Sequence, residues 1–218
     1  MSKVIVLMGP PGSGKGTQAR LLAERLGLPH ISTGDIFRAM KAADTPLGEE
    51  LRATLASGAL FPDDLTNRIV RERTDAEDCR GGYVLDGYPR TTAQAEALEK
   101  IASGQGHALS AVFIDVPFDI LEKRLTGRRS CPVCGEIYNV YLKPPKVEDF
   151  CDFHPEARLK HRTDDNPETI RTRLVTYERD TRPLLDYYER TGRLRRVDAT
   201  RTPEEVYADI EKIVTSDK

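Results

Sequence analysis

The sequence has no long apolar run, no excess of basic charge and only 4 cysteines among its 218 residues. No stretch approaches the roughly 20 apolar residues that a transmembrane helix needs. The apolar run near the N-terminus, residues 4–8, lacks the length and the cleavage site of a secretory signal. We therefore expect a cytoplasmic protein that binds no membrane. Lys and Arg number 33 against 35 Asp and Glu, and this balance argues against a nucleic-acid-binding protein.

The length allows one domain with a sizeable core and room for insertions. Hydrophobic residues make up 39% and charged residues 31% of the chain, as in a soluble globular protein, and nothing indicates more than a monomer. Because the cytoplasm is reducing, we expect the cysteines to be metal ligands or free thiols rather than a disulfide framework.

Short apolar segments alternate with helical patterns along most of the chain. Apolar spacing predicts a helix over 19–26 and a long helix over 166–189, and Thr202 and Glu205 are spaced for a capping box at the start of the last helix. This alternation predicts an α/β fold, with a parallel five-stranded sheet flanked by helices. The predicted strands are 3–8, 30–32, 82–86, 111–116 and 194–198.

Two regions interrupt the alternation, and we interpret both as insertions. Residues 32–61 hold two short helical patterns, whereas residues 127–163 hold paired cysteines, prolines and aromatic residues without a helical period. The predicted core domain therefore consists of residues 1–31, 62–126 and 164–218.

Residues 9–17, GPPGSGKGT, follow the first predicted strand and open the first predicted helix. Glycines let consecutive backbone N–H groups point at phosphate oxygens, the helix dipole adds positive charge, and the lysine can reach the transferred phosphate. Gly16 stands where the general pattern has Ser or Thr, which argues against a magnesium ligand at that position. The alternative is a tight strand-to-helix turn without a ligand. The pattern predicts a P-loop that binds nucleotide phosphates through Gly12, Ser13, Gly14, Lys15, Gly16 and Thr17.

Cysteines and a histidine in the second insertion have the spacing C-x₂-C-x₁₆-C-x₂-H. Two thiolates separated by two residues and followed by glycine can bind one ion, and four N/S ligands suit a tetrahedral, structural Zn²⁺ with no open position. The predicted ligands are Cys131, Cys134, Cys151 and His154.

Other readings of these residues stay open. The cysteines can be reduced thiols without a metal, or Cys131 and Cys134 can form a disulfide. His161 and Asp152 are competing ligands with less suitable spacing, and Cys79 stands apart as a packing residue.

The P-loop sequence through residue 18 resembles that of the adenylate kinases and their nucleoside-monophosphate kinase relatives. The resemblance continues, in the same order, through STGDIFR at 32–38, DGYPR at 86–90 and RTDD at 162–165. It implies a P-loop-type core that reversibly converts ATP and AMP to two ADP with Mg²⁺. It further implies that residues 32–61 bind AMP and that residues 127–163 form a zinc-binding lid.

The resemblance also implies roles for individual residues. Asp86 orients magnesium through water, Arg128 and Arg201 contact ATP, and the pair 164–165 is either a brace for lid arginines or a solvated pair. Tyr88 replaces a more common phenylalanine, and we expect its hydroxyl to change little at an open site. The implied AMP-binding residues are Thr33, Arg38, Leu60, Phe61, Gly87, Arg90, Gln94, Arg162 and Arg173. The implied catalytic residues are Lys15, Arg90, Arg124, Arg128, Arg162 and Arg173.

Two other functions remain to be weighed against this one. A kinase of the same class can accept UMP or CMP in place of AMP. A nucleotide-binding or zinc-dependent interaction module without turnover is the alternative from another class, although binding alone does not require so many convergent cations.

Overall fold

The computed structural model describes residues 2–40 and 45–216. Its centre is a five-stranded parallel sheet, as the alternating pattern predicts, and the structure places the strands in the order β2-β3-β1-β4-β7. The strands lie within a residue or two of the predicted ranges, except that β4 begins three residues earlier. They are β1 (Lys3–Met8), β2 (His30–Ser32), β3 (Gly82–Asp86), β4 (Ala108–Asp115) and β7 (Leu194–Asp198).

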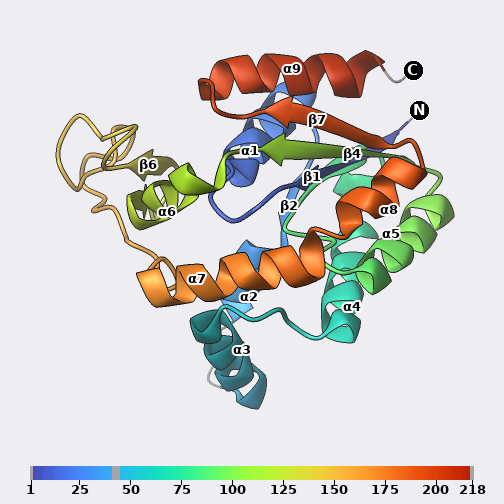
Figure 1. Cartoon of the computed structure of the whole chain (residues 1–218), viewed down its shortest axis with the longest axis horizontal. Coiled ribbons are helices and arrows are strands. Elements are labelled where there is room, and N and C mark those ends of the chain that lie inside the picture. The colour runs from blue at the N-terminus through green and yellow to red at the C-terminus, as the bar shows by residue number, and fades with distance from the viewer. Residues whose placement is uncertain (1, 41–44, 217–218) are drawn as a thin grey trace.

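Helices cover both faces of this sheet (Figure 1). One face packs against α1 (Lys15–Leu26), α6 (Phe118–Thr126), α7 (Pro167–Thr176) and α9 (Pro203–Ser216). The other packs against α4 (Asp63–Thr74), α5 (Thr92–Gly104) and α8 (Leu184–Arg190), with the short turn η1 (Glu77–Cys79) between α4 and β3.

Side chains of β1 alternate between these two cores because successive residues of a strand point to opposite faces. Val4 and Val6 are buried on one side, while Ile5 and Leu7 are buried on the other. A parallel sheet covered on both faces reads as a continuous apolar run. This is why the strand could be recognised from its sequence.

The segment predicted as one long helix over 166–189 is instead divided into three parts. Between α7 and α8 lies a π-helical turn, η2 (Tyr177–Thr181). Across it the buried side chains change core, since Ile170 and Leu174 pack on one face of the sheet and Tyr177 on the other. The predicted capping box of α9 is confirmed, because Thr202 and Glu205 each accept a bond from the other's backbone N–H.

Two insertions extend from the carboxyl edge of the sheet (Figure 1). The first contains α2 (Thr33–Met40) and α3 (Pro46–Ser57), and α3 contacts α7 through a bond from Thr169 Oγ1 to the Ala56 carbonyl oxygen. The second contains the antiparallel hairpin of β5 (Arg128–Ser130) and β6 (Ile137–Asn139). Its own apolar core is small and includes Tyr138 and Leu159.

Removing packing atoms from the central sheet should reduce stability far more than removing the same atoms from the surface. Val84 in β3 is fully buried, whereas Val175 in α7 is 65% exposed. We expect Val84→Ala to lower the free energy of unfolding by about 2 kcal/mol, from lost burial and the cavity left behind. Val175→Ala should change it by less than about 0.5 kcal/mol. Urea unfolding of both variants checks this, and equal midpoints would contradict it.

Candidate active site

The P-loop joins β1 to α1 by a turn that a side chain would obstruct. Gly9 has φ +146°, and a Cβ there would lie 2.7 Å from the Ile114 carbonyl oxygen of β4. The predicted ATP-binding residues follow in the turn and in the first turn of α1, whose helix begins at Lys15. The first N–H groups of a helix have no partner within it, so this end of α1 suits an anion.

Lys15 lies at the mouth of this loop and donates to its carbonyl oxygens. Its Nζ is 2.8 Å from the oxygen of Gly9 and 2.9 Å from that of Pro10. Burial lowers the pKa of Lys15 to about 8, although Asp86 opposes the shift. An anion that replaced the carbonyl oxygens would therefore stabilise the charged amine.

Asp86 ends β3 directly opposite the start of α1. A Cβ on Gly16 would lie 3.3 Å from Asp86 Oδ2, so the glycine leaves room for this carboxylate. Burial raises the pKa of Asp86, but the His30 ring, whose Nε2 lies 3.8 Å from Oδ2, and the charge of Lys15 outweigh it and lower the pKa overall. Gly16, which is predicted not to be a magnesium ligand, therefore lies next to Asp86, which is predicted to orient magnesium through water.

A cavity opens beside the end of β3 and between the first insertion and α7. Gly87, with φ +78°, lies at its floor, and a Cβ there would be 2.9 Å from an Arg90 nitrogen. The Gly87 carbonyl oxygen accepts bonds of 2.8 Å from both Thr33 Oγ1 and Arg90 Nε. The positive φ therefore favours glycine here, and a Cβ would also displace the ends of the Arg90 and Thr33 side chains. The residues predicted to bind AMP that line this cavity are Thr33, Arg38, Leu60, Phe61, Gly87, Arg90, Gln94 and Arg173.

Two features of this cavity were absent from the sequence-based prediction. The Gln94 amide donates to Asp63 Oδ1 at 2.7 Å and accepts from the Arg90 backbone N–H at 2.8 Å. Phe61 stacks on Phe37 with 3.8 Å between ring centroids. The only sequence signal for Asp63 was its place in an acidic first helical turn, which is typical of many helices.

The expectation of an open site at Tyr88 is wrong. Tyr88 is 1% exposed, and its hydroxyl lies 2.7 Å from Asn67 Oδ1 and 3.1 Å from the Gln94 carbonyl oxygen. The added hydroxyl is accommodated because acceptors on α4 and α5 face it. A buried tyrosine hydroxyl generally needs such a partner.

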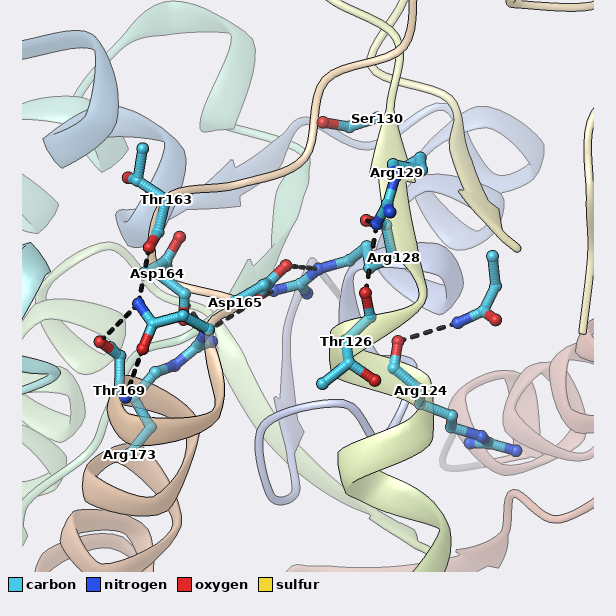
Figure 2. Close-up of polar contacts among 12 residues, drawn as sticks. Arg124, Thr126, Arg128, Arg129, Ser130, Thr163, Asp164, Asp165, Thr169 and Arg173 are labelled. Carbon is cyan, nitrogen blue, oxygen red and sulfur yellow. Dashed lines mark hydrogen bonds and ion pairs between the residues drawn. The ribbon is translucent and has the colours of Figure 1, made fainter. Parts of the chain in front are cut away.

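Asp165 joins two predicted catalytic arginines (Figure 2). Its fully buried carboxylate accepts two bonds from Arg128, at 2.8 and 2.6 Å, and one from Arg173 at 3.0 Å. Asp164 Oδ2 lies 3.1 Å from the same nitrogen of Arg173. The acidic pair is therefore a brace for arginines rather than a solvated pair.

The remaining predicted arginines lie around this brace and the P-loop. Burial and the neighbouring Arg128 and Arg38 lower the pKa of Arg162 to about 10. Burial and the neighbouring Arg173 do the same for Arg90. Several cations thus share a site where each destabilises the others, and a polyanion would relieve this repulsion.

Arg124 and Arg201 lie farther toward β7. Arg124 spans the P-loop and the segment after β7, donating to the carbonyl oxygens of Ser13 at 3.3 Å and Ala199 at 3.0 Å. Arg201 instead pairs with Asp209 of α9 at the surface. Arg124 therefore lies beside the P-loop, whereas Arg201 is paired with Asp209 of α9.

The four predicted metal ligands converge in the second insertion. One donor atom from each of Cys131, Cys134, Cys151 and His154 lies within 4.8 Å of all the others. Cys134 Sγ is 3.7 Å from Cys151 Sγ, which is 3.9 Å from His154 Nδ1. Donors of this kind and number fit a tetrahedral zinc ion.

The structure argues against a disulfide and against Asp152 as a ligand. All four cysteines are free thiols, so Cys131 and Cys134 form no disulfide. Asp152 accepts a bond from the Lys146 backbone N–H instead of joining the cluster. Cys79 is buried beside Arg73, and burial raises the pKa of its thiol to about 11, as suits a packing residue.

Comparison with known proteins gives a consistent result. A model of the family described as "Adenylate kinase" matches residues 7–193. An adenylate kinase of Thermodesulfovibrio yellowstonii is 50% identical over 94% of this chain and 96% of its own length. Adenylate kinases of Bacillus licheniformis and Caldanaerobacter subterraneus are 49% and 46% identical over 96% and 98% of this chain, and 97% of each relative is covered. Among the described residues, no helix is long and apolar enough to cross a membrane.

The metal cluster predicts a single zinc ion per chain in protein purified without chelators. Cys151→Ser should abolish zinc binding, whereas Cys79→Ser should retain it because Cys79 lies outside the cluster. Removal of zinc should lower the melting temperature while the core keeps its fold, since the second insertion has little apolar core of its own. Elemental analysis and thermal unfolding with a chelator measure both effects. Protein that contains no zinc would contradict the prediction.

Proposed function

The chain belongs to the adenylate kinase family, and from this premise we propose how its own side chains carry out the family's reaction. That reaction is the reversible transfer of a phosphoryl group from ATP to AMP, giving two ADP, and ATP binds with Mg²⁺. The observation that carries the proposal is the proximity of Lys15 to three arginines. Arg90, Arg128 and Arg173 are each close enough for their positive charge to lower the pKa of Lys15.

On the donor side, the P-loop N–H groups and Lys15 hold the phosphates of ATP. Lys15 leaves the carbonyl oxygens of Gly9 and Pro10 for a phosphate oxygen, which compensates better for the burial of its charge. Arg124 lies beside the loop, where it can contact ATP from the opposite side. Arg201 is the weaker assignment because it must first leave Asp209.

On the acceptor side, Arg90 and Arg38 hold the phosphate of AMP, and Gln94 reads the base. Arginine suits this task because its planar guanidinium grips phosphate through parallel hydrogen bonds. Arg90 is already directed by the Gly87 carbonyl oxygen, so little freedom remains to be lost on binding. The first insertion, residues 32–61, is thereby the AMP-binding part of the molecule.

The transferred group lies between these sites, where Arg128, Arg162 and Arg173 stabilise its charge. Phosphoryl transfer passes through a loose transition state whose charge is spread over several oxygens, so catalysis is mainly positioning and electrostatics. Asp86 would orient a magnesium ion bound with ATP through water, and the ion would supply positive charge to the ATP phosphates. Asp165 holds two of the arginines in position.

The second insertion acts as a lid that excludes water during transfer. Asn139 Nδ2 donates to the Arg124 carbonyl oxygen at 2.9 Å, and Glu136 lies 3.3 Å from Arg20 of α1, so both the root and the hairpin contact the core. A zinc ion would let this small segment move as one body. Closure would protect ATP from hydrolysis. We further propose that the protein is a cytoplasmic monomer that binds neither membrane nor nucleic acid. The balanced charge supports the absence of nucleic-acid binding.

The AMP assignment is tested by comparing nucleoside monophosphates as acceptors. We expect kcat/KM for AMP to exceed that for UMP and CMP by at least about 10²-fold, because a site that hydrogen-bonds one base leaves polar groups unpaired with another. A coupled assay with ATP as donor measures the three rates. Equal rates with UMP or CMP would assign the chain a different acceptor.

Turnover, as opposed to nucleotide binding alone, is tested at two adjacent arginines. Arg128 is bonded to the Asp165 carboxylate, whereas Arg129 donates to the carbonyl oxygens of Thr126 and Arg128. We expect Arg128→Ala to lower kcat by about 10²-fold, since it removes charge that stabilises the transition state. Arg129→Ala should lower kcat by less than about threefold.

Calorimetry of ATP binding is the control for this pair of variants. Arg128→Ala should still bind ATP, because the P-loop supplies most of the contacts. Unchanged kcat in Arg128→Ala would remove Arg128 from the catalytic group.

A further inference from the structure

Both polar atoms of the Gln94 amide, Oε1 and Nε2, are hydrogen-bonded. It is the third residue of α5, and Thr91 Oγ1 accepts a bond of 3.2 Å from its backbone N–H, which is a helix N-cap. A glutamine at this position of a capping box needs only its carbonyl oxygen, to accept from the backbone before the helix. Here the amide nitrogen is also engaged, by Asp63 Oδ1 from the neighbouring helix α4. Capping alone does not account for this second bond.

The two partners leave the amide one orientation. A carboxylate oxygen only accepts, so Asp63 must face the Gln94 nitrogen, and a peptide N–H only donates, so Arg90 must face the Gln94 oxygen. An amide has two hydrogens and two acceptor positions. One hydrogen on Nε2 and one acceptor position on Oε1 therefore remain, on a residue that lines the cavity and is 2% exposed.

This remaining pattern distinguishes bases by chemistry. The adenine edge presents an amino donor beside a ring-nitrogen acceptor, which an amide can bind with two parallel bonds. A purine with a carbonyl at C6 presents an acceptor to Oε1 and a ring N–H to Nε2, so both contacts become repulsive. It would be accepted only if the amide rotated by half a turn, and that rotation breaks the bonds to Asp63 and Arg90.

We propose that Asp63 is a positioning residue for base selection, which holds the Gln94 amide so that the site accepts 6-aminopurine and rejects 6-oxopurine monophosphates. Asp63 is itself directed by a bond of 3.0 Å from Thr91 Oγ1 to its Oδ2. It follows Phe61 by two residues, at the start of α4, so the base-lining segment and the orienting carboxylate are parts of one turn. The inference rests on the proposed contact between Gln94 and the base.

The test compares AMP with IMP, which differs at C6 and N1 but has the same shape. The measured quantity is the ratio of kcat/KM for AMP to that for IMP, with ATP as donor. We expect Asp63→Ala to reduce this ratio at least about tenfold, because the amide keeps only the bond from the Arg90 N–H and the rotated orientation then costs less. Asp63→Asn should retain most of the selectivity, since its amide oxygen can still accept from Gln94 while its nitrogen donates to Thr91.

Asp64→Ala is the matched control, because Asp64 is the next residue of the same helical turn and is exposed. It should leave the ratio unchanged, and KM for ATP should stay constant in all variants. Asp63→Ser, whose hydroxyl is too short to reach Gln94, replaces Asp63→Ala should that variant not fold. A merely structural role for Asp63 would lower activity with both nucleotides alike and leave the ratio within about twofold, which would overturn the inference.

Gln94→Ala separates this inference from the proposed function. If Gln94→Ala collapses the ratio and Asp63→Ala does not, Gln94 reads the base without help from Asp63, and the inference fails alone. If Gln94→Ala leaves the ratio unchanged, the proposed contact between Gln94 and the base is wrong, and the inference fails with it. Loss of selectivity in both variants, with Asp63→Asn retaining it, supports the positioning role.

Discussion

The carboxylate of Asp165 is fully buried and bonded to two arginines from different parts of the chain. A buried charge is tolerated only when it is paired and hydrogen-bonded, so this carboxylate requires Arg128 from the root of the second insertion and Arg173 from α7 to meet. The second insertion and the core are thereby joined at Asp165.

Several buried, positively charged side chains surround Asp165. Burial and mutual repulsion lower the pKa of Lys15, Arg90 and Arg162, so these cations are held where they are less stable than in water. Phosphate groups would reverse much of that cost, and the developing charge of a transferred phosphoryl group would do so without reorganisation of the site. Parallel strands make the arrangement possible, because their carboxyl ends bring the P-loop, the segment after β3 and the segment after β7 to one edge.

The second insertion has to be held together with little apolar core of its own. It has few buried apolar residues, yet its clustered thiols and histidine are held together with Tyr138 behind them. Such a segment would gain rigidity from a bound metal rather than from a core. This rigidity would matter because the Arg128 side chain lies at its root, where loosening would move a charge beside the proposed phosphate site.

The sequence alone determined the features that depend on local chemistry. The apolar run of β1, the glycine-lysine turn after it and the cysteine spacing can each be read from short stretches of the chain, so the strands, the P-loop and the ligand set were predictable. Long-range contacts were not. The π-helical turn η2 divided a segment whose pattern read as one helix, because side chains there change from one core to the other. Tyr88 is buried rather than open, and Asp63 reaches Gln94 across 31 positions. Only the packing of α4 against α5 decides such pairs, since the sequence sets which groups exist and the tertiary structure sets which of them meet.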